Sequence, residues 1–177
     1  MGIDVVQFAR ALDYAAMKHV RQRRKGEAKE PYLNHLAEVA ALLAEATGGE
    51  DVNLVIAGLL HDCIEDQGVT YDELVALFGA DVAGLVRDVT DDTTLLKAER
   101  KRLQVEQTPH KSGRVKMLKI ADKTSNLRAL AVSPPSGWDE QRKREYYAWA
   151  QAVVAGCRGV NAFLEAKFDE AFLNGQR

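Results

Sequence analysis

The segment LLHDCIED, residues 59–66, places a histidine and three carboxylates directly after an apolar run. If a helix continues through the segment, His61 lies above Glu65, because residues four apart share a face. Asp62 lies above Asp66 in the same way. An isolated His-Asp pair is usually a solvated surface pair, but unpaired charge beside a buried segment is costly. Three carboxylates around one imidazole also repel unless protons or a cation offset them. The segment therefore predicts a divalent metal site.

Composition is ordinary for a globular protein of one domain. The 177 residues are 46% hydrophobic and 28% charged, and Lys+Arg 24 against Asp+Glu 26 gives a formal net charge of −2. This balance does not favour nucleic acid or an anionic membrane as a partner, and the apolar runs are too short to span a bilayer. The N-terminus lacks the basic region and apolar core of a signal peptide. Cys63 and Cys157 form no paired motif, which suits a reducing cytoplasm, so we expect a cytoplasmic protein.

Apolar residues recur at helical spacing along the chain, and no segment alternates convincingly like a strand, so the fold class is all-α. Asp51 and Thr70 are predicted N-caps, and Gly26 is predicted to end the first helix. His19 on that helix is interpreted as a packing or surface histidine. The predicted helices cover residues 3–22, 32–46, 51–66, 70–79, 81–89, 94–107, 114–131 and 139–174, the last with a break near Gly156 and Gly159.

Two further side chains extend the predicted metal site. His35 lies beside apolar residues one turn into the second helix, where a histidine by itself is more often part of the core. Asp122 falls among apolar residues of a later helix, with Asn126 on the same face, and a carboxylate there needs a partner. If His35, the His-Asp pair and Asp122 converge, they supply two imidazoles and two carboxylates.

Such a donor set contains no thiolate, so it suits Mn²⁺, Mg²⁺ or Fe²⁺ better than a structural zinc. A divalent metal with open positions lowers the pKa of a bound water towards neutrality. Glu65 and Asp66 lie one turn farther along and are placed to orient that water and move its protons. The residues alone therefore predict a metal-dependent hydrolase, with phosphate esters or anhydrides as the favoured substrates.

Two charged segments complete this part of the prediction. The basic run at residues 21–25 suits the negative end of the first helix dipole, or else an anion or nucleotide, and the sequence alone leaves both open. Residues 94–107 alternate in charge sign, which indicates an exposed helix with i,i+4 pairs rather than a stripe for nucleic acid.

The same residues resemble a known family, the HD-domain phosphohydrolase superfamily. Within it, the hydrolase domain of RelA/SpoT proteins is similar to RRKG at 23–26, PYLNH at 31–35, LLHDCIED at 59–66 and KIADKTSNLR at 119–128.

A narrower resemblance is to the small single-domain alarmone hydrolases related to the metazoan SpoT homologue. It is carried by the small size of the chain, TDD at 90–92, ERKRLQVEQ at 99–107 and GW at 137–138. The resemblance covers nearly the whole chain and leaves no segment for a synthetase domain. It implies an HD-domain helical bundle that forms a single compact domain over residues 1–177.

The resemblance also implies an activity, a metal and a set of functional residues. The activity is Mn²⁺-dependent removal of the 3′-pyrophosphate from ppGpp or pppGpp, which releases GDP or GTP and pyrophosphate, as in a guanosine-3′,5′-bis(diphosphate) 3′-pyrophosphohydrolase. The positions that match manganese ligands are His35, His61, Asp62 and Asp122. The positions that match catalytic residues are Glu65 and Asp66. The positions that match nucleotide contacts are Arg24, Lys25, Lys97, Asn126, Arg142 and Tyr146.

Three positions depart from the family pattern. Leu36 stands where proline is usual, Gln67 where threonine is common, and Ala129 where the long enzymes often have threonine. The first two look structural, and the third concerns one nucleotide contact and no metal ligand.

Two other functions remain open. One is another nucleotide phosphohydrolase on the same scaffold, such as removal of the 2′-phosphate of NADPH. The other is a nucleotide-binding module with an inactive site, against which the Glu65–Asp66 pair argues, because a binder does not need it. The sequence does not decide the oligomeric state.

Overall fold

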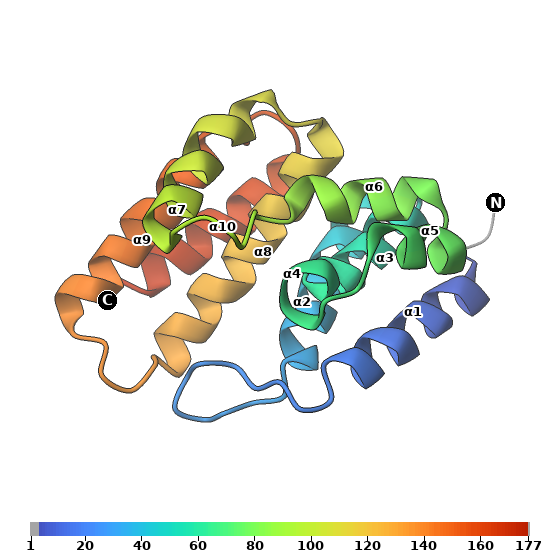
Figure 1. Ribbon diagram of the computed structural model, residues 1–177. Coiled ribbons are helices and arrows are strands. Elements are labelled where there is room, and N and C mark those ends of the chain that lie inside the picture. The colour runs from blue at the N-terminus through green and yellow to red at the C-terminus, as the bar shows by residue number, and fades with distance from the viewer. Residues whose placement is uncertain (1–3, 177) are drawn as a thin grey trace. The chain divides into compact units, whose positions relative to one another are not determined.

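The computed structural model describes residues 4–176, and within this range the chain forms helices and no strand. Figure 1 shows them in chain order from blue to red. The predicted all-α class is therefore confirmed. The helices are α1 (Val5–Lys18), α2 (Leu33–Thr47), α3 (Val52–Leu60), α4 (Cys63–Gln67), α5 (Tyr71–Phe78), α6 (Ala80–Val89), α7 (Lys97–Gln107), α8 (Gly113–Val132), α9 (Glu140–Ala155) and α10 (Ala162–Asn174), with a 3₁₀ turn, η1, at Thr108–His110.

The helices divide between two compact units. The first unit comprises residues up to 22 together with 31–93, and the second comprises residues 23–30 together with the chain from 94 onward. The chain thus passes from the first unit to the second for the loop at residues 23–30, returns to the first at residue 31, and enters the second again at residue 94. The prediction of one domain over residues 1–177 stays a prediction.

Helix α3 is the centre of the first unit. All residues from Leu54 to Leu60 are buried, and α1, α2 and α6 pack around this helix. Burying one leucine side chain contributes about 1.5–3 kcal/mol, so the apolar sequence of α3 drives the assembly of this unit. The Asp51 carboxylate caps the helix by accepting a hydrogen bond of 3.1 Å from the Leu54 N–H, as predicted.

A glycine permits the close approach of α2 and α3. A Cβ atom at Gly58 would lie 2.8 Å from Leu43 Cδ1 and 3.3 Å from Ala40 Cα, which is too close for a larger residue. This approach also positions side chains at the ends of the two helices. The rings of His35, near the start of α2, and His61, just after α3, have centroids 5.1 Å apart.

The second unit is built on α8, which is 20 residues long and packs against α9 and α10. The Ser112 hydroxyl caps α8 by accepting from the Val115 N–H. Helix α7 contacts α9 and buries no residue of its own. Arg102 on α7 pairs with Glu99 and Glu106, one turn away on either side, which confirms the predicted exposed, charge-alternating helix.

Two of the predicted helices differ clearly from the observed ones. The first helix ends at Lys18 rather than residue 22, so neither Gly26 nor the basic run lies at its end, and residue 3 is outside the described range. The predicted helix over 51–66 is interrupted at His61 and Asp62, where Asp62 adopts φ −99° and ψ 0°. The break predicted within 139–174 is confirmed between α9 and α10. Among the described helices, none is both long enough and apolar enough to cross a membrane.

Candidate functional site

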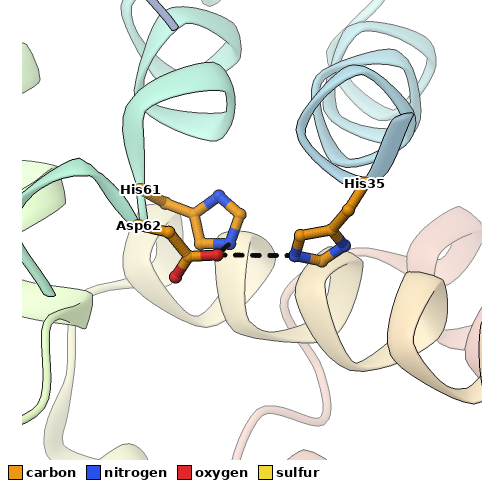
Figure 2. A group of neighbouring side chains, drawn as sticks. All are labelled: His35, His61 and Asp62. Atoms are coloured by element: carbon orange, nitrogen blue, oxygen red, sulfur yellow. Dashed lines mark ion pairs between the residues drawn. The ribbon is translucent and has the colours of Figure 1, made fainter. Parts of the chain in front are cut away.

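Three of the predicted metal ligands lie together in the first unit. One ligand atom each from His35, His61 and Asp62 fall within 4.8 Å of one another. His35 projects from α2, and His61 and Asp62 occupy the turn between α3 and α4, so the side chains point towards one another (Figure 2). Asp62 Oδ2 lies 3.1 Å from His61 Nε2 and 3.6 Å from His35 Nε2.

Contacts behind the cluster fix the orientation of these groups. His61 Nδ1 lies 2.8 Å from the Gly58 carbonyl oxygen, which can only accept, so Nδ1 carries a proton and Nε2 is the ring nitrogen that faces Asp62. The Tyr32 hydroxyl donates a hydrogen bond of 2.6 Å to Asp62 Oδ2. A ring nitrogen with a fixed tautomer and a carboxylate with a fixed rotamer are typical of metal ligands.

The donor set fits a divalent cation. Both histidines are buried, with 2% and 5% of their surface exposed, and the carboxylate is mostly buried as well. Two imidazole nitrogens and a carboxylate oxygen suit a metal of the first transition series. Among the described residues, neither cysteine belongs to this group.

Glu65 and Asp66 lie on α4, immediately after the cluster. Burial raises the pKa of Glu65, and the nearby carboxylates of Asp91 and Asp62 raise it further. The Asp91 N–H donates a hydrogen bond of 3.3 Å to Glu65 Oε2. Asp66 is exposed, and its Oδ2 accepts a hydrogen bond of 2.7 Å from Gln22 Nε2. The Asp66 N–H donates to the Asp62 carbonyl, which is the first helical hydrogen bond of α4.

Cys63 lies in the same segment but is a core residue. Its side chain is fully buried, and burial together with the charge of Asp62 raises its pKa to about 12. Thiols in such surroundings stay protonated and are poor nucleophiles.

Asp122, the fourth predicted metal ligand, lies on α8 in the second unit. Asp122 Oδ1 accepts a hydrogen bond of 2.7 Å from Asn126 Nδ2, and Asn126 Oδ1 accepts one of 3.2 Å from the guanidinium of Arg24. The ammonium of Lys123 lies 2.9 Å from Asp122 Oδ2. The predicted ligand and two predicted nucleotide contacts are therefore joined side chain to side chain. The inclusion of Asp122 in the metal site stays a prediction.

The loop that carries Arg24 and Lys25 is anchored to the end of α8. The Ala28 N–H donates to the Ser133 hydroxyl at 2.9 Å, and the Glu27 N–H donates to the Pro134 carbonyl at 3.2 Å. Gly26 permits this contact, because a Cβ atom there would collide with the Ser133 carbonyl oxygen. For Arg24 and Lys25 the interpretation as helix-dipole partners is thus wrong, because α1 ends at Lys18 and both residues lie in this anchored loop.

Other predicted nucleotide contacts form a basic cluster in the second unit. Burial lowers the pKa of Lys97, and the charges of Lys25 and Arg142 lower it further. Cations close enough to repel one another in this way favour an anionic ligand. The guanidinium of Arg142 lies 4.7 Å from the centre of the Trp138 ring, and Tyr146 packs at 5.7 Å from the same ring.

Sequence reasoning missed several residues that support the predicted ones. Tyr32 bonds to Asp62 and Gln22 to Asp66 from 30 and 44 residues away, and no local pattern announces such a partner. The role of Lys123 could have been predicted. An aspartate among apolar residues of a helix needs a partner, and Lys123 is its neighbour in the sequence.

Comparison with known proteins gives consistent matches along the chain. The family model described as HD domain matches residues 11–153. The guanosine-3′,5′-bis(diphosphate) 3′-pyrophosphohydrolase MESH1 of Xenopus tropicalis is 47% identical over 174 residues, which cover 98% of this chain and 97% of the frog protein. The MESH1 protein of Homo sapiens is 48% identical over 172 residues, which cover 97% of this chain and 96% of the human protein.

A solved structure is similarly close. It is described as "A metazoan ortholog of SpoT hydrolyzes ppGpp and plays a role in starvation responses", and it matches with a TM-score of 0.92 and 45% sequence identity. The match covers 98% of this chain and 97% of that one.

Proposed function

Because this chain belongs to the HD-domain family, and within it to the MESH1 group, we propose that it removes the 3′-pyrophosphate from ppGpp or pppGpp with the help of Mn²⁺. The observation that carries the proposal is the cluster of His35, His61 and Asp62, with ligand atoms within 4.8 Å of one another. This cluster occurs in a protein that is similar, along nearly its full length, to proteins named for this reaction.

The proposed metal ligands are the three clustered residues together with Asp122. When bound, a divalent cation would polarise a phosphoryl oxygen and lower the pKa of a water molecule. The Nδ1–H of His61 and the hydroxyl of Tyr32 would keep two of the ligands in place before the metal arrives.

Glu65 is the proposed general base. Its raised pKa makes its carboxylate a stronger base near neutral pH than an exposed glutamate would be. It would take a proton from a water molecule as the water oxygen bonds to the phosphorus next to the ribose. The bond from that phosphorus to the ribose 3′-oxygen then breaks. The 3′-oxygen takes up the proton that Glu65 received, which the Asp66 carboxylate can pass on, and GDP or GTP leaves with a free 3′-hydroxyl beside the released pyrophosphate.

The basic cluster of the second unit is the proposed site for the negatively charged substrate. The charges of Lys25 and Arg142 are near enough to Lys97 to lower its pKa, and Arg24 is held by Asn126. A substrate with several phosphates would relieve the repulsion among these cations, which favours its binding.

Turnover by the purified protein tests the proposal. We expect Mn²⁺-dependent release of pyrophosphate from ppGpp and pppGpp, with much slower release of phosphate from NADPH. Mg²⁺ and Zn²⁺ serve as comparison metals. Faster turnover of NADPH would favour the second phosphohydrolase function, and nucleotide binding without turnover of any substrate would favour an inactive module.

Glu65→Gln tests the catalytic assignment. The variant keeps the shape of the side chain but removes the base, so kcat should fall by about 10²–10⁴-fold while Mn²⁺ content and KM stay near wild type. Asp72→Asn, which neutralises an exposed carboxylate on α5, is the matched control and should keep full turnover. Loss of metal in Glu65→Gln would make Glu65 a ligand, and full turnover would remove it from the chemistry.

A further inference from the structure

Behind Asp66 lies a chain of hydrogen-bonding side chains that belong to no predicted site. Gln22 Nε2 lies 2.7 Å from Asp66 Oδ2, and Gln22 Oε1 lies 2.5 Å from both Gln67 Nε2 and His19 Nδ1. His19 Nε2 lies 3.5 Å from Cys63 Sγ. These hydrogen-bonded side chains therefore connect the exposed carboxylate of Asp66 to the fully buried thiol of Cys63.

The carboxylate sets the direction of every bond in this chain. An ionised carboxylate only accepts, so the amide of Gln22 must turn its NH₂ group towards Asp66. Its carbonyl oxygen then faces the other way and accepts from Gln67 and from the Nδ1–H of His19. With the proton on Nδ1, His19 Nε2 is an acceptor, so the Cys63 thiol is the donor in the contact of 3.5 Å between them. Each of these contacts then joins a donor to an acceptor.

His19, at the end of these contacts farthest from Asp66, is held firmly in place by its surroundings. His19 is only 2% exposed, and its ring stacks on Tyr32 with centroids 5.3 Å apart and 17° between the planes. Tyr32 in turn donates its hydroxyl proton to Asp62. One buried histidine therefore stands behind both Asp62 and Asp66.

A hydrogen bond to an exposed carboxylate usually contributes little, because water competes for both groups and the side chains are free to rotate. Gln22 differs because its carbonyl oxygen is held by two donors, one of them on a buried ring. Its NH₂ group therefore keeps one direction, and the carboxylate that it bonds is held in one rotamer.

We propose that Gln22 is a positioning residue that holds Asp66 in its reactive orientation, and that His19 and Gln67 set the direction of the Gln22 amide. This inference rests on the proposed function, in which Asp66 handles a proton during hydrolysis. Gln22 acts through the Asp66 carboxylate and is neither a proposed metal ligand nor a proposed nucleotide contact, so its removal should affect turnover and leave binding intact.

Four variants test the proposal on the full-length protein. Gln22→Leu keeps the size of the side chain but removes the donor, and we expect kcat to fall by about 10- to 100-fold, as for a misplaced catalytic group, with KM and Mn²⁺ content unchanged. His19→Leu should lower kcat in the same way. His19→Asn places an amide nitrogen where Nδ1 stood, so it should restore most of the lost turnover, which a purely packing role would not do.

Asp66→Asn separates this inference from the proposed function. In an Asp66→Asn background, Gln22→Leu should cause no further loss, because both substitutions act through the same carboxylate. If Asp66→Asn is inactive while Gln22→Leu keeps wild-type kcat, the positioning role is overturned and the proposed function stands. If Asp66→Asn keeps full turnover, the catalytic role of Asp66 and the positioning role fall together. Equal losses in His19→Asn and His19→Leu, or loss of Mn²⁺ from Gln22→Leu, would also overturn the inference.

Discussion

Glu65 is the titratable residue whose surroundings change its pKa in the direction that general-base chemistry requires. Burial is the largest cause, and the carboxylates of Asp91 and Asp62 add to it, while the N–H of Asp91 acts in the opposite direction. The same shift that makes Glu65 a better base is unfavourable for folding at neutral pH, because an ionised group is held among other carboxylates.

The raised pKa of Glu65 leads us to predict how the stability of the protein depends on pH. A raised pKa means that the folded protein binds the Glu65 proton more tightly than the unfolded chain does. The contribution of Glu65 to stability therefore falls as pH rises from the ordinary carboxyl pKa, about 4.3, through the raised value. Glu65→Gln removes this dependence, so the variant should gain stability relative to wild type as pH increases.

Urea unfolding of both proteins in the presence of a chelator, at about pH 5 and about pH 8, measures this difference. Asp72→Asn is again the control, since Asp72 is exposed. A stability difference that stays constant with pH would contradict the effect of burial on Glu65.

Single residues also show where sequence reasoning succeeds. The cluster that could hold a metal was predictable in part because a histidine and an aspartate stand next to each other after a buried run, where their charge has no ordinary explanation. Tyr32 and His19 were not predicted as partners of the site. A tyrosine or a histidine next to apolar residues is common, and only the fold reveals that their polar atoms face Asp62 and Gln22.

At the scale of the element, caps were predicted well and one interruption was not. Asp51 and Thr70 accept the N–H groups that their positions in the sequence indicate. The break at His61–Asp62 carries no glycine or proline, so no local signal marks it. It coincides with the candidate metal cluster, where tertiary contacts override helix propensity.

The loop over residues 23–30 gives a prediction about substrate binding. Lys25 lies close enough to Lys97 to lower its pKa, so Lys25→Ala should reduce kcat/KM by roughly 1–3 kcal/mol, or about 5- to 150-fold. The control is Lys29→Ala, which removes an exposed lysine from the same loop and should leave kcat/KM within about twofold of wild type. Equal effects of the two substitutions would indicate that Lys25 contributes only general charge.

For the whole molecule, the metal should act as a stabilising ligand. Free Mn²⁺ at 100 times its Kd stabilises a folded protein by about 2.7 kcal/mol, which is roughly 5–10 °C in Tm for a chain of this size. Thermal melts with and without Mn²⁺ measure the shift. His35→Ala and Asp122→Ala should abolish it together with bound manganese.

Cys63→Ala provides the control for these melts. The substitution lowers Tm because it leaves a small cavity in the core, but the increase caused by Mn²⁺ should remain. An undiminished Mn²⁺ shift in Asp122→Ala would exclude Asp122 from the metal site, and loss of the shift in Cys63→Ala would add the thiol to it.

The path of the chain limits how this protein can be divided. Residues 23–30 belong to the second unit although the chain on both sides of them belongs to the first. Cleavage between residues 93 and 94 would leave the Arg24 and Lys25 loop on the N-terminal fragment and its Ser133 anchor on the other. The two halves are therefore unsuited to exchange between homologous enzymes as separate modules, and split-protein reassembly would have to restore this loop before the proposed substrate site could form.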